Sequence, residues 1–168
     1  MLPEEFWVWV FYPENEYDCH KSVGIKNQMS RHRHEPKEEK KISYDWKNKT
    51  ILVADDIDSN YVYIKAAVKH TNVEVLWAKN GFEAVELVKK NSSINLVLMD
   101  IVMPDMDGFE ATKQIKTFNS KIPVVCQTAY STNENYKAAL DCGFDSFMAK
   151  PIKVEGMLQI IDKFFSKN

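Results

Sequence analysis

Three aspartates stand directly after two short apolar runs of the sequence. Asp100 follows LVLM at 96–99, and Asp55 and Asp56 follow ILVA at 51–54. If both runs are parallel strands, their carboxyl ends meet at one edge of a sheet and bring the three carboxylates together. Carboxylates so close repel one another and resist ionisation unless a cation lies among them. Oxygen ligands at a water-exposed edge favour Mg²⁺ over zinc, which prefers His and Cys.

A hydroxyl and a lysine follow two later apolar runs. Thr128 comes after PVVCQ, and Lys150 comes shortly after FDSFM. A divalent cation, an ammonium and a hydroxyl around one carboxylate can neutralise and position a phosphoryl group, which is what phosphoryl transfer requires. The central carboxylate, Asp100, would then be the nucleophile.

Short apolar runs alternate with amphipathic stretches over most of the chain. This alternation predicts an α/β domain with a doubly wound parallel sheet and helices on both faces. Ser59 is a candidate helix cap, and the pairs Asn80 with Glu83 and Asp107 with Glu110 have the spacing of capping boxes. The expected strands span 51–54, 73–77, 96–99, 123–126 and 144–148.

The composition limits the class of protein. The chain has 168 residues, of which 45% are hydrophobic and 12% aromatic, enough for one packed domain with an appendage. The formal net charge of −2 shows no basic surplus, so we expect no direct binding to nucleic acid. The three cysteines lack metal or redox spacing and the acidic start MLPEE is not a secretory signal. We therefore expect a cytoplasmic location and no membrane contact.

A polar, charged stretch separates two parts of the sequence. Residues 14–48 show no sustained periodicity, and RHRHEPKEEKK at 31–41 is their extreme. Ahead of them, FWVWVFY at 6–12 alternates as a strand does, although a lone strand has nothing to pair with. We therefore expect a mostly disordered extension or linker over 1–48, with one candidate strand at 6–12, and a folded domain over 49–168.

Four motifs, in order, resemble the receiver domains of two-component response regulators. They are the acid pair in ILVADD, the aspartate in LVLMDIVMPDMDG, the threonine in VVCQTAY and the lysine in FMAKPI. The resemblance covers about Lys49 to Phe165, and DDIDSN, QTAY and AKPI are most similar to receivers attached to hybrid histidine kinases. It implies a flavodoxin-like sheet of five parallel strands in the order 2-1-3-4-5, with five helices on its two faces.

The resemblance also implies a role in a phosphorelay. Asp100 would accept a phosphoryl group from a phosphohistidine on a histidine kinase or a histidine phosphotransfer protein. Asp55 and Asp56 would hold Mg²⁺, together with Asp100 and the backbone carbonyl of Val102. The chain would assist its own phosphorylation and also its own dephosphorylation, which would be slow. It would not be an enzyme in the ordinary sense.

A conformational switch is implied by the same resemblance. Thr128 would bond one phosphoryl oxygen and Lys150 another, and Phe147 would swing inward when Thr128 moves. The bond between Lys150 and Pro151 would be cis. The phosphoryl group would then be passed on to a partner, or phosphorylation would change the surface formed by the fourth helix, fifth strand and fifth helix. A homodimer could form through the same surface.

Two side chains differ from the common pattern of these domains. Val102 lies two places after Asp100, and Tyr130 lies two places after Thr128. In receivers these positions flank the path of the water that hydrolyses the acyl phosphate. An apolar side chain and a bulky aromatic one should hinder that water, so we expect slow autodephosphorylation.

Two other function classes stay open at this stage. Asp56 and Asp58 form a D-x-D pattern, which fits the nucleophile and acid of a Mg²⁺-dependent phosphohydrolase of the haloacid dehalogenase type. The sequence shows neither the cap domain nor the late acidic pair of that family. The third class is a receiver-shaped interaction module that is never phosphorylated, which the complete set of motif residues disfavours.

Overall fold

The computed structural model of this chain describes residues 43–129 and 141–166. The candidate strand at 6–12, Tyr130 and the fourth helix expected within 131–140 lie outside these ranges. Within them, none of the helices is long and apolar enough to cross a bilayer.

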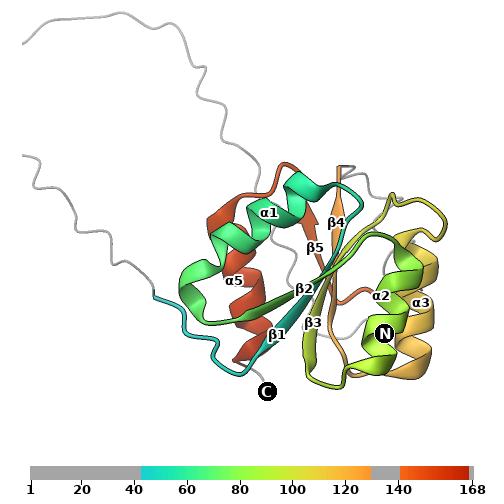
Figure 1. Ribbon diagram of the computed structural model, residues 1–168, viewed down its shortest axis with the longest axis horizontal. Helices are drawn as coiled ribbons and strands as arrows, with labels where there is room; N and C mark the ends of the chain where they lie inside the picture. The colour runs from blue at the N-terminus through green and yellow to red at the C-terminus, as the bar shows by residue number, and fades with distance from the viewer. Residues whose placement is uncertain (1–42, 130–140, 167–168) are drawn as a thin grey trace, which may run out of the picture. The chain divides into compact units, whose positions relative to one another are not determined.

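The strands form one parallel sheet in the order β2-β1-β3-β4-β5 (Figure 1). This order and the doubly wound architecture confirm the predicted fold class. The observed strands differ from the expected ranges by one to two residues at most ends. Strands β1 and β3 extend beyond their apolar runs, whereas β2, β4 and β5 begin one to two residues later than expected. They are β1 (Thr50–Ala54), β2 (Glu74–Ala78), β3 (Ile94–Asp100), β4 (Val124–Thr128) and β5 (Ser146–Ala149).

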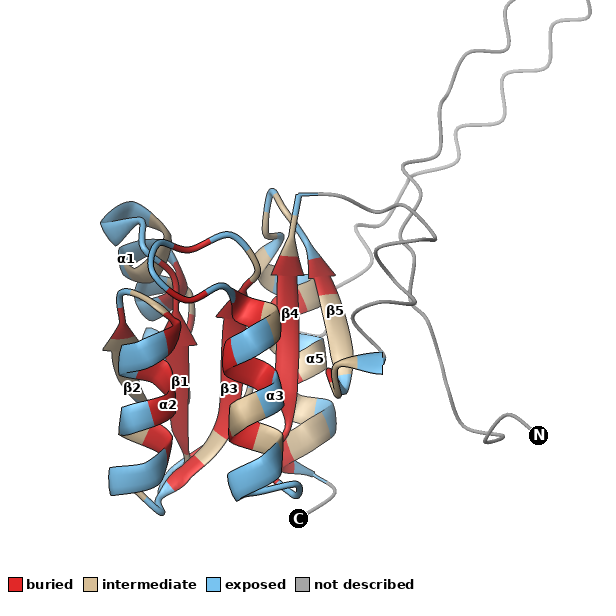
Figure 2. Ribbon diagram, turned by 90° about the vertical axis from the view of Figure 1, so that its right-hand side faces the viewer, coloured by how far each residue is buried: buried red, intermediate tan, exposed pale blue. Residues whose placement is uncertain are grey.

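Helices cover both faces of the sheet. Helices α1 (Asp58–Ala67) and α5 (Val154–Phe165) pack on one face, and α2 (Gly81–Lys90) and α3 (Gly108–Phe118) pack on the other, while the short 3-10 helix η1 (Lys69–Thr71) follows α1. Alternate residues of the strands point to opposite faces of the sheet and pack into two separate apolar cores. The central strands are buried along most of their length (Figure 2). Strands buried on both faces explain why their sequences are continuous apolar runs.

Helix starts follow the predicted caps at two of three places. The Asn80 side chain accepts a hydrogen bond from the Glu83 N–H at the start of α2, and the Asp107 side chain accepts one from the Glu110 N–H at the start of α3. The prediction that Ser59 caps α1 is wrong, because α1 begins earlier, after Ile57, and no side chain caps it.

Residues ahead of the expected domain start at Lys49 take part in the core. Trp46 is buried, its ring meets that of Phe165 edge-on with centroids 5.5 Å apart, and its Nε1 donates to Asp162 Oδ1 at 3.1 Å. The compact unit that contains the sheet runs from Ser43 to Asn168. The division of the chain into an extension and a receiver domain stays a prediction, with Trp46 assigned to the folded part.

Candidate functional site

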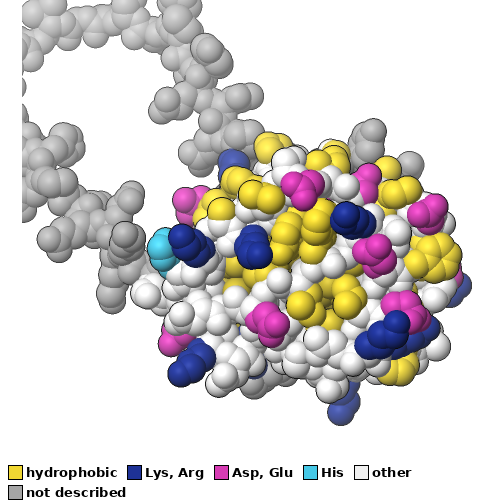
Figure 3. All heavy atoms as spheres, viewed as in Figure 1, with side chains coloured by type: hydrophobic (Ala, Val, Ile, Leu, Met, Phe, Trp, Pro, Cys, Tyr) yellow, Lys and Arg dark blue, Asp and Glu magenta, His cyan; other side chains and the backbone are white. Residues whose placement is uncertain are grey.

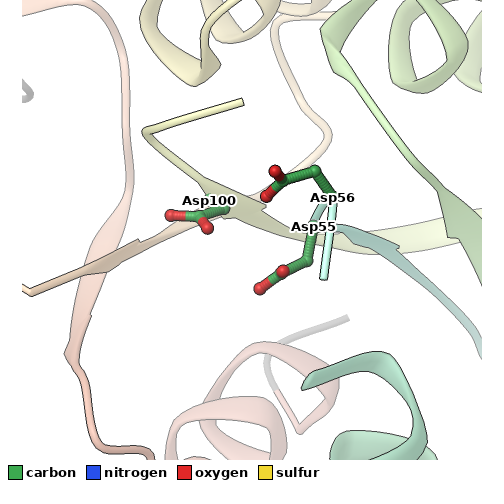
Figure 4. Close-up of side chains that lie close together, drawn as sticks. All are labelled: Asp55, Asp56 and Asp100. Carbon is green, nitrogen blue, oxygen red and sulfur yellow. The ribbon is translucent and has the colours of Figure 1, made fainter. Parts of the chain in front are cut away.

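Three carboxylates meet at the carboxyl edge of the sheet. Asp100 is the last residue of β3, and Asp55 and Asp56 follow β1, its neighbour in the sheet. One oxygen of each lies within 4.8 Å of an oxygen of the others, and Figure 4 shows the three side chains gathered at this edge. Asp55 and Asp100 are buried and Asp56 is exposed, so the group is open to water on the side of Asp56.

The Lys150 side chain extends to this group from the end of β5, the edge strand on the far side of β4. It follows β5, and its Nζ donates to Asp100 Oδ2 at 2.6 Å and to Asp55 Oδ2 at 3.1 Å. The peptide bond from Lys150 to Pro151 is cis, as expected. Burial lowers the pKa of Lys150, but the hydrogen bonds and charges of Asp100 and Asp55 outweigh it and leave this pKa raised. The ammonium is therefore charged at neutral pH.

Asp100 lies in an environment that disfavours its charge. Burial raises the pKa of its carboxyl above the ordinary value, the hydrogen bond and charge of Lys150 oppose this, and the charge of Asp55 adds to the rise. The Val102 N–H donates weakly to Asp100 Oδ1, at 3.4 Å. A carboxylate that is poorly solvated and only partly neutralised is a suitable nucleophile, and it gains from an additional cation.

Asp55 is held by a set of donors that the sequence analysis missed. Its Oδ1 accepts the Ile57 N–H at 3.0 Å, and the Asn60 amide group donates to Oδ1 and Oδ2, at 3.0 Å each. The backbone oxygen of Asp55 accepts the indole N–H of Trp77 at 2.9 Å. Asn60 is part of the DDIDSN motif, and its spacing of five residues from Asp55, across the start of a helix, is the sequence signal for this contact.

The loop after β3 fixes the direction of Asp100. Asp105 has a left-handed backbone, with φ 66°, and the Gly108 N–H donates to the Ile101 oxygen at 2.9 Å. A Cβ atom at Gly108 would overlap the carbonyl oxygen of Asp100, so only glycine fits this approach. Val102 projects from the same loop and is 71% exposed.

Thr128 and Phe147 lie on neighbouring strands at the same edge. Thr128 ends β4 and pairs with Ala149, and Phe147 pairs with Cys126. Because side chains alternate along strands, Thr128 and Phe147 share the sheet face that carries α2 and α3, where Phe147 is half-buried. The structure therefore brings the two expected switch residues onto one face.

Asp58, the second residue of the D-x-D pattern, is not part of this group, and Cys126 is a core residue. Asp58 begins α1, is exposed, and is absent from the carboxylate cluster found in the described ranges. Burial raises the pKa of the Cys126 thiol to about 12, so Cys126 is a packing residue and not a reactive thiolate.

The donor set fits a divalent cation. Three carboxylates carry three negative charges against the one positive charge of Lys150, which leaves two negative charges to be balanced. All available ligands are oxygen atoms, which hard cations such as Mg²⁺ prefer. Asp56 is exposed and can bind directly, whereas Asp55 must first give up part of its hydrogen bonding, since both of its oxygens accept donors.

Comparison with known proteins agrees with this geometry. The sequence pattern of the response regulator receiver domain matches residues 51–162. The transcriptional regulatory protein ZraR of Klebsiella oxytoca is 41% identical over 102 residues, which cover 61% of this chain and 23% of that protein. The sensor protein GacS of Pseudomonas syringae pv. syringae is 30% identical over 119 residues, which cover 68% of this chain and 13% of that protein. The chain thus spans less than a quarter of the length of either relative.

Solved structures show the same fold. The receiver domain of the Francisella response regulator 1452 superimposes with a TM-score of 0.67 at 25% identity, covering 71% of this chain and 98% of that one. The receiver of the sensor histidine kinase PA1611 of Pseudomonas aeruginosa, solved with magnesium in its active site cleft, has a TM-score of 0.65 at 24% identity, covering 70% and 98%. With the sheet order, the carboxylate group and the matched pattern in agreement, the chain belongs to the receiver domains of two-component systems.

Proposed function

We propose that Asp100 is the phosphoacceptor of a two-component phosphorelay and that a phosphohistidine, on a histidine kinase or a histidine phosphotransfer protein, is the donor. The observation that carries this is the meeting of Asp100 with two further carboxylates and Lys150 at one edge of the sheet. An Asp100 oxygen attacks the phosphorus, an O–P bond forms as the P–N bond breaks, and the departing imidazole keeps the electron pair.

The neighbouring residues divide the remaining work. Lys150, already 2.6 Å from Asp100 Oδ2, pairs with an oxygen of the transferred group, and the Thr128 hydroxyl bonds another. Phe147 swings inward when Thr128 moves toward the phosphoryl group, because the two side chains lie on one face of the sheet. Asp55, Asp56, Asp100 and the Val102 carbonyl would hold Mg²⁺, which would supply positive charge where the transfer builds up negative charge.

The surroundings of the site support a protein donor. Ile57 and Val102, each two residues after one of the buried carboxylates, are 50% and 71% exposed. Exposed apolar side chains beside a charged site favour docking of another protein surface. On the face shown in Figure 3, positive and negative side chains are interspersed with apolar surface, without a basic patch of the kind that binds nucleic acid.

The phosphohydrolase alternative has less support. Its acid, Asp58, lies outside the carboxylate group, and the D-x-D nucleophile would be Asp56, which is exposed and carries no described lysine contact. The family match and the sheet order also favour a receiver. The unphosphorylated interaction module would leave the pairing of Lys150 with Asp100 without a chemical role.

The test is intact mass after incubation with Mg²⁺ and acetyl phosphate. Wild type should gain one phosphoryl group, Asp100→Asn should gain none, and Asp105→Asn, which changes an exposed carboxylate of the same loop, should behave as wild type. Release of phosphate that depends on Asp56, without a mass gain, would establish the hydrolase instead. No reaction at all would favour the interaction module.

Finer parts of the proposal have their own tests. Slow dephosphorylation is expected from Val102 and Tyr130, and a Tyr130→Ala variant should lose its phosphoryl group faster. Homodimerisation through the fourth helix, fifth strand and fifth helix, onward transfer to a partner, and a cytoplasmic location stay predictions. The first is measured by comparing the molecular mass in solution before and after phosphorylation.

A further inference from the structure

Gln127 is a buried polar residue that none of the roles above uses. It lies in β4, its side chain is fully buried, and neither its Oε1 nor its Nε2 has a hydrogen-bond partner in the part of the chain that the structure describes. A buried amide without partners destabilises the folded state, because its polar atoms lose their bonds to water and gain none in return. Such a group calls for a physical reason, because buried side-chain amides are nearly always paired.

The position of Gln127 connects it with the phosphoryl site. It is the strand partner of Asp100 on β3 and of Met148 on β5. Side chains alternate along β4, so Gln127 faces the same side as Val125, the side on which α1 and α5 pack. Asp100 follows Leu98 on that side by the same alternation. The Gln127 and Asp100 side chains therefore stand next to each other on adjacent strands.

The Lys150 side chain crosses above this position. Lys150 follows β5, whereas its acceptors, Asp100 and Asp55, belong to β3 and to the end of β1. Since β4 lies between β5 and β3, the lysine must pass over the carboxyl end of β4, where Gln127 is placed. An ammonium has three N–H groups, and the two carboxylates take two of them.

We propose that Gln127 is a positioning residue that accepts a hydrogen bond from Lys150 when Asp55 turns its Oδ2 toward a bound cation. Without such an acceptor, release of Lys150 from Asp55 would leave a half-buried ammonium short of one partner. The Gln127 oxygen keeps the lysine near Asp100 while Asp55 becomes available. This inference rests on the proposed cation site but not on phosphoryl transfer.

Mg²⁺ binding tests the inference without any phosphorylation. The indole N–H of Trp77 donates to the backbone oxygen of Asp55, so its signal in ¹H–¹⁵N spectra should shift as Mg²⁺ is added. The rise of the unfolding midpoint with Mg²⁺ gives a second measure of the same affinity. Gln127→Met, which keeps the side-chain length and removes both amide atoms, should bind Mg²⁺ about tenfold more weakly, as expected for one lost hydrogen bond to a charged group.

Three comparisons separate this role from a structural one. Thr112→Val removes a second buried polar side chain with an unpaired atom among the described residues, on the opposite face of the sheet, and should leave Mg²⁺ affinity unchanged. Gln127→Glu keeps an acceptor oxygen at the same position and should bind Mg²⁺ at least as well as wild type. In a Lys150→Met background, Gln127→Met should change the affinity by less than about twofold, because no ammonium remains to be held.

The possible results lead to different conclusions. Equal Mg²⁺ affinity of wild type and Gln127→Met, or a tenfold loss that persists in the Lys150→Met background, would overturn the role of Gln127. A wild type that gives no response to Mg²⁺ by either measure would overturn the cation site and this inference together. Failure of phosphorylation in the mass experiment, with Mg²⁺ binding intact, would affect only the proposed function.

Discussion

Replacing Asn60 with Ala tests whether Asp55 depends on the amide that clamps it. The amide nitrogen lies 3.0 Å from each Asp55 oxygen, and Asp55 is 0% exposed, so water cannot easily replace the lost donor. A hydrogen bond to a charged group contributes about 1.5–3 kcal/mol. Because the Ile57 N–H and Lys150 remain as donors, we expect the free energy of unfolding to fall by about 2–3 kcal/mol.

The assay is urea unfolding at neutral pH without Mg²⁺, followed by circular dichroism. Ser59→Ala is the matched control, since Ser59 is the exposed neighbour of Asn60 in α1 and makes no cap; its change should stay within about 0.5 kcal/mol. Asn60→Asp should cost more than Asn60→Ala, because it removes the donor and places a second negative charge against a buried carboxylate. A loss for Asn60→Ala no larger than that of Ser59→Ala would refute the clamp.

Further substitutions probe other parts of the site and the core. Gly108→Ala should lower the free energy of unfolding by about 1–3 kcal/mol, because the added Cβ displaces the Asp100 carbonyl, and it should reduce phosphorylation in the mass assay; wild-type values for both would contradict the close approach. Trp46→Ala should lower the free energy of unfolding, measured with urea, by about 3–5 kcal/mol, because Trp46 is buried in the core. A decrease below about 1 kcal/mol would show that Trp46 belongs to the linker and not to the folded domain. Since the pKa of Asp100 is raised, the folded chain binds its proton more tightly than the unfolded chain, and this carboxyl stabilises the fold less as pH rises through its folded-state pKa. Asp100→Asn should therefore be more stable than wild type at pH 7, and its advantage should shrink as pH falls toward the ordinary range for Asp; an advantage that grew on acidification would refute the raised pKa.

The sheet and the carboxylate group could be predicted because both depend on local patterns. Strands buried on both faces leave continuous apolar runs, and in a parallel sheet the residue after each run must lie at the carboxyl edge. This pattern predicts Asp55, Asp100 and Lys150 at one edge of the sheet, and the distances among their side chains agree with that placement.

The remaining features depend on where each element begins. Asn60 faces Asp55 because α1 starts directly after Ile57. A cap at Ser59 predicts a helix that starts two residues later, and from that start the contact with Asp55 does not follow. Trp46 stands among polar residues, and nothing in its neighbourhood predicts that α5 supplies Asp162 and Phe165 to receive it. Contacts between residues so far apart in sequence follow from packing and leave no local pattern.

The buried tryptophan ahead of β1 also decides where a tether can be attached. The Trp46 N–H donates to the Thr71 oxygen, and the indole is fixed to the last helix near its end, so the backbone from Ser43 is fastened at the amino edge of the sheet. Asp100 lies at the opposite edge. A tag, surface linker or fused reporter joined ahead of Ser43 is therefore anchored at the edge away from Asp100. Immobilisation through that point suits measurements in which a donor protein must approach Asp100 freely.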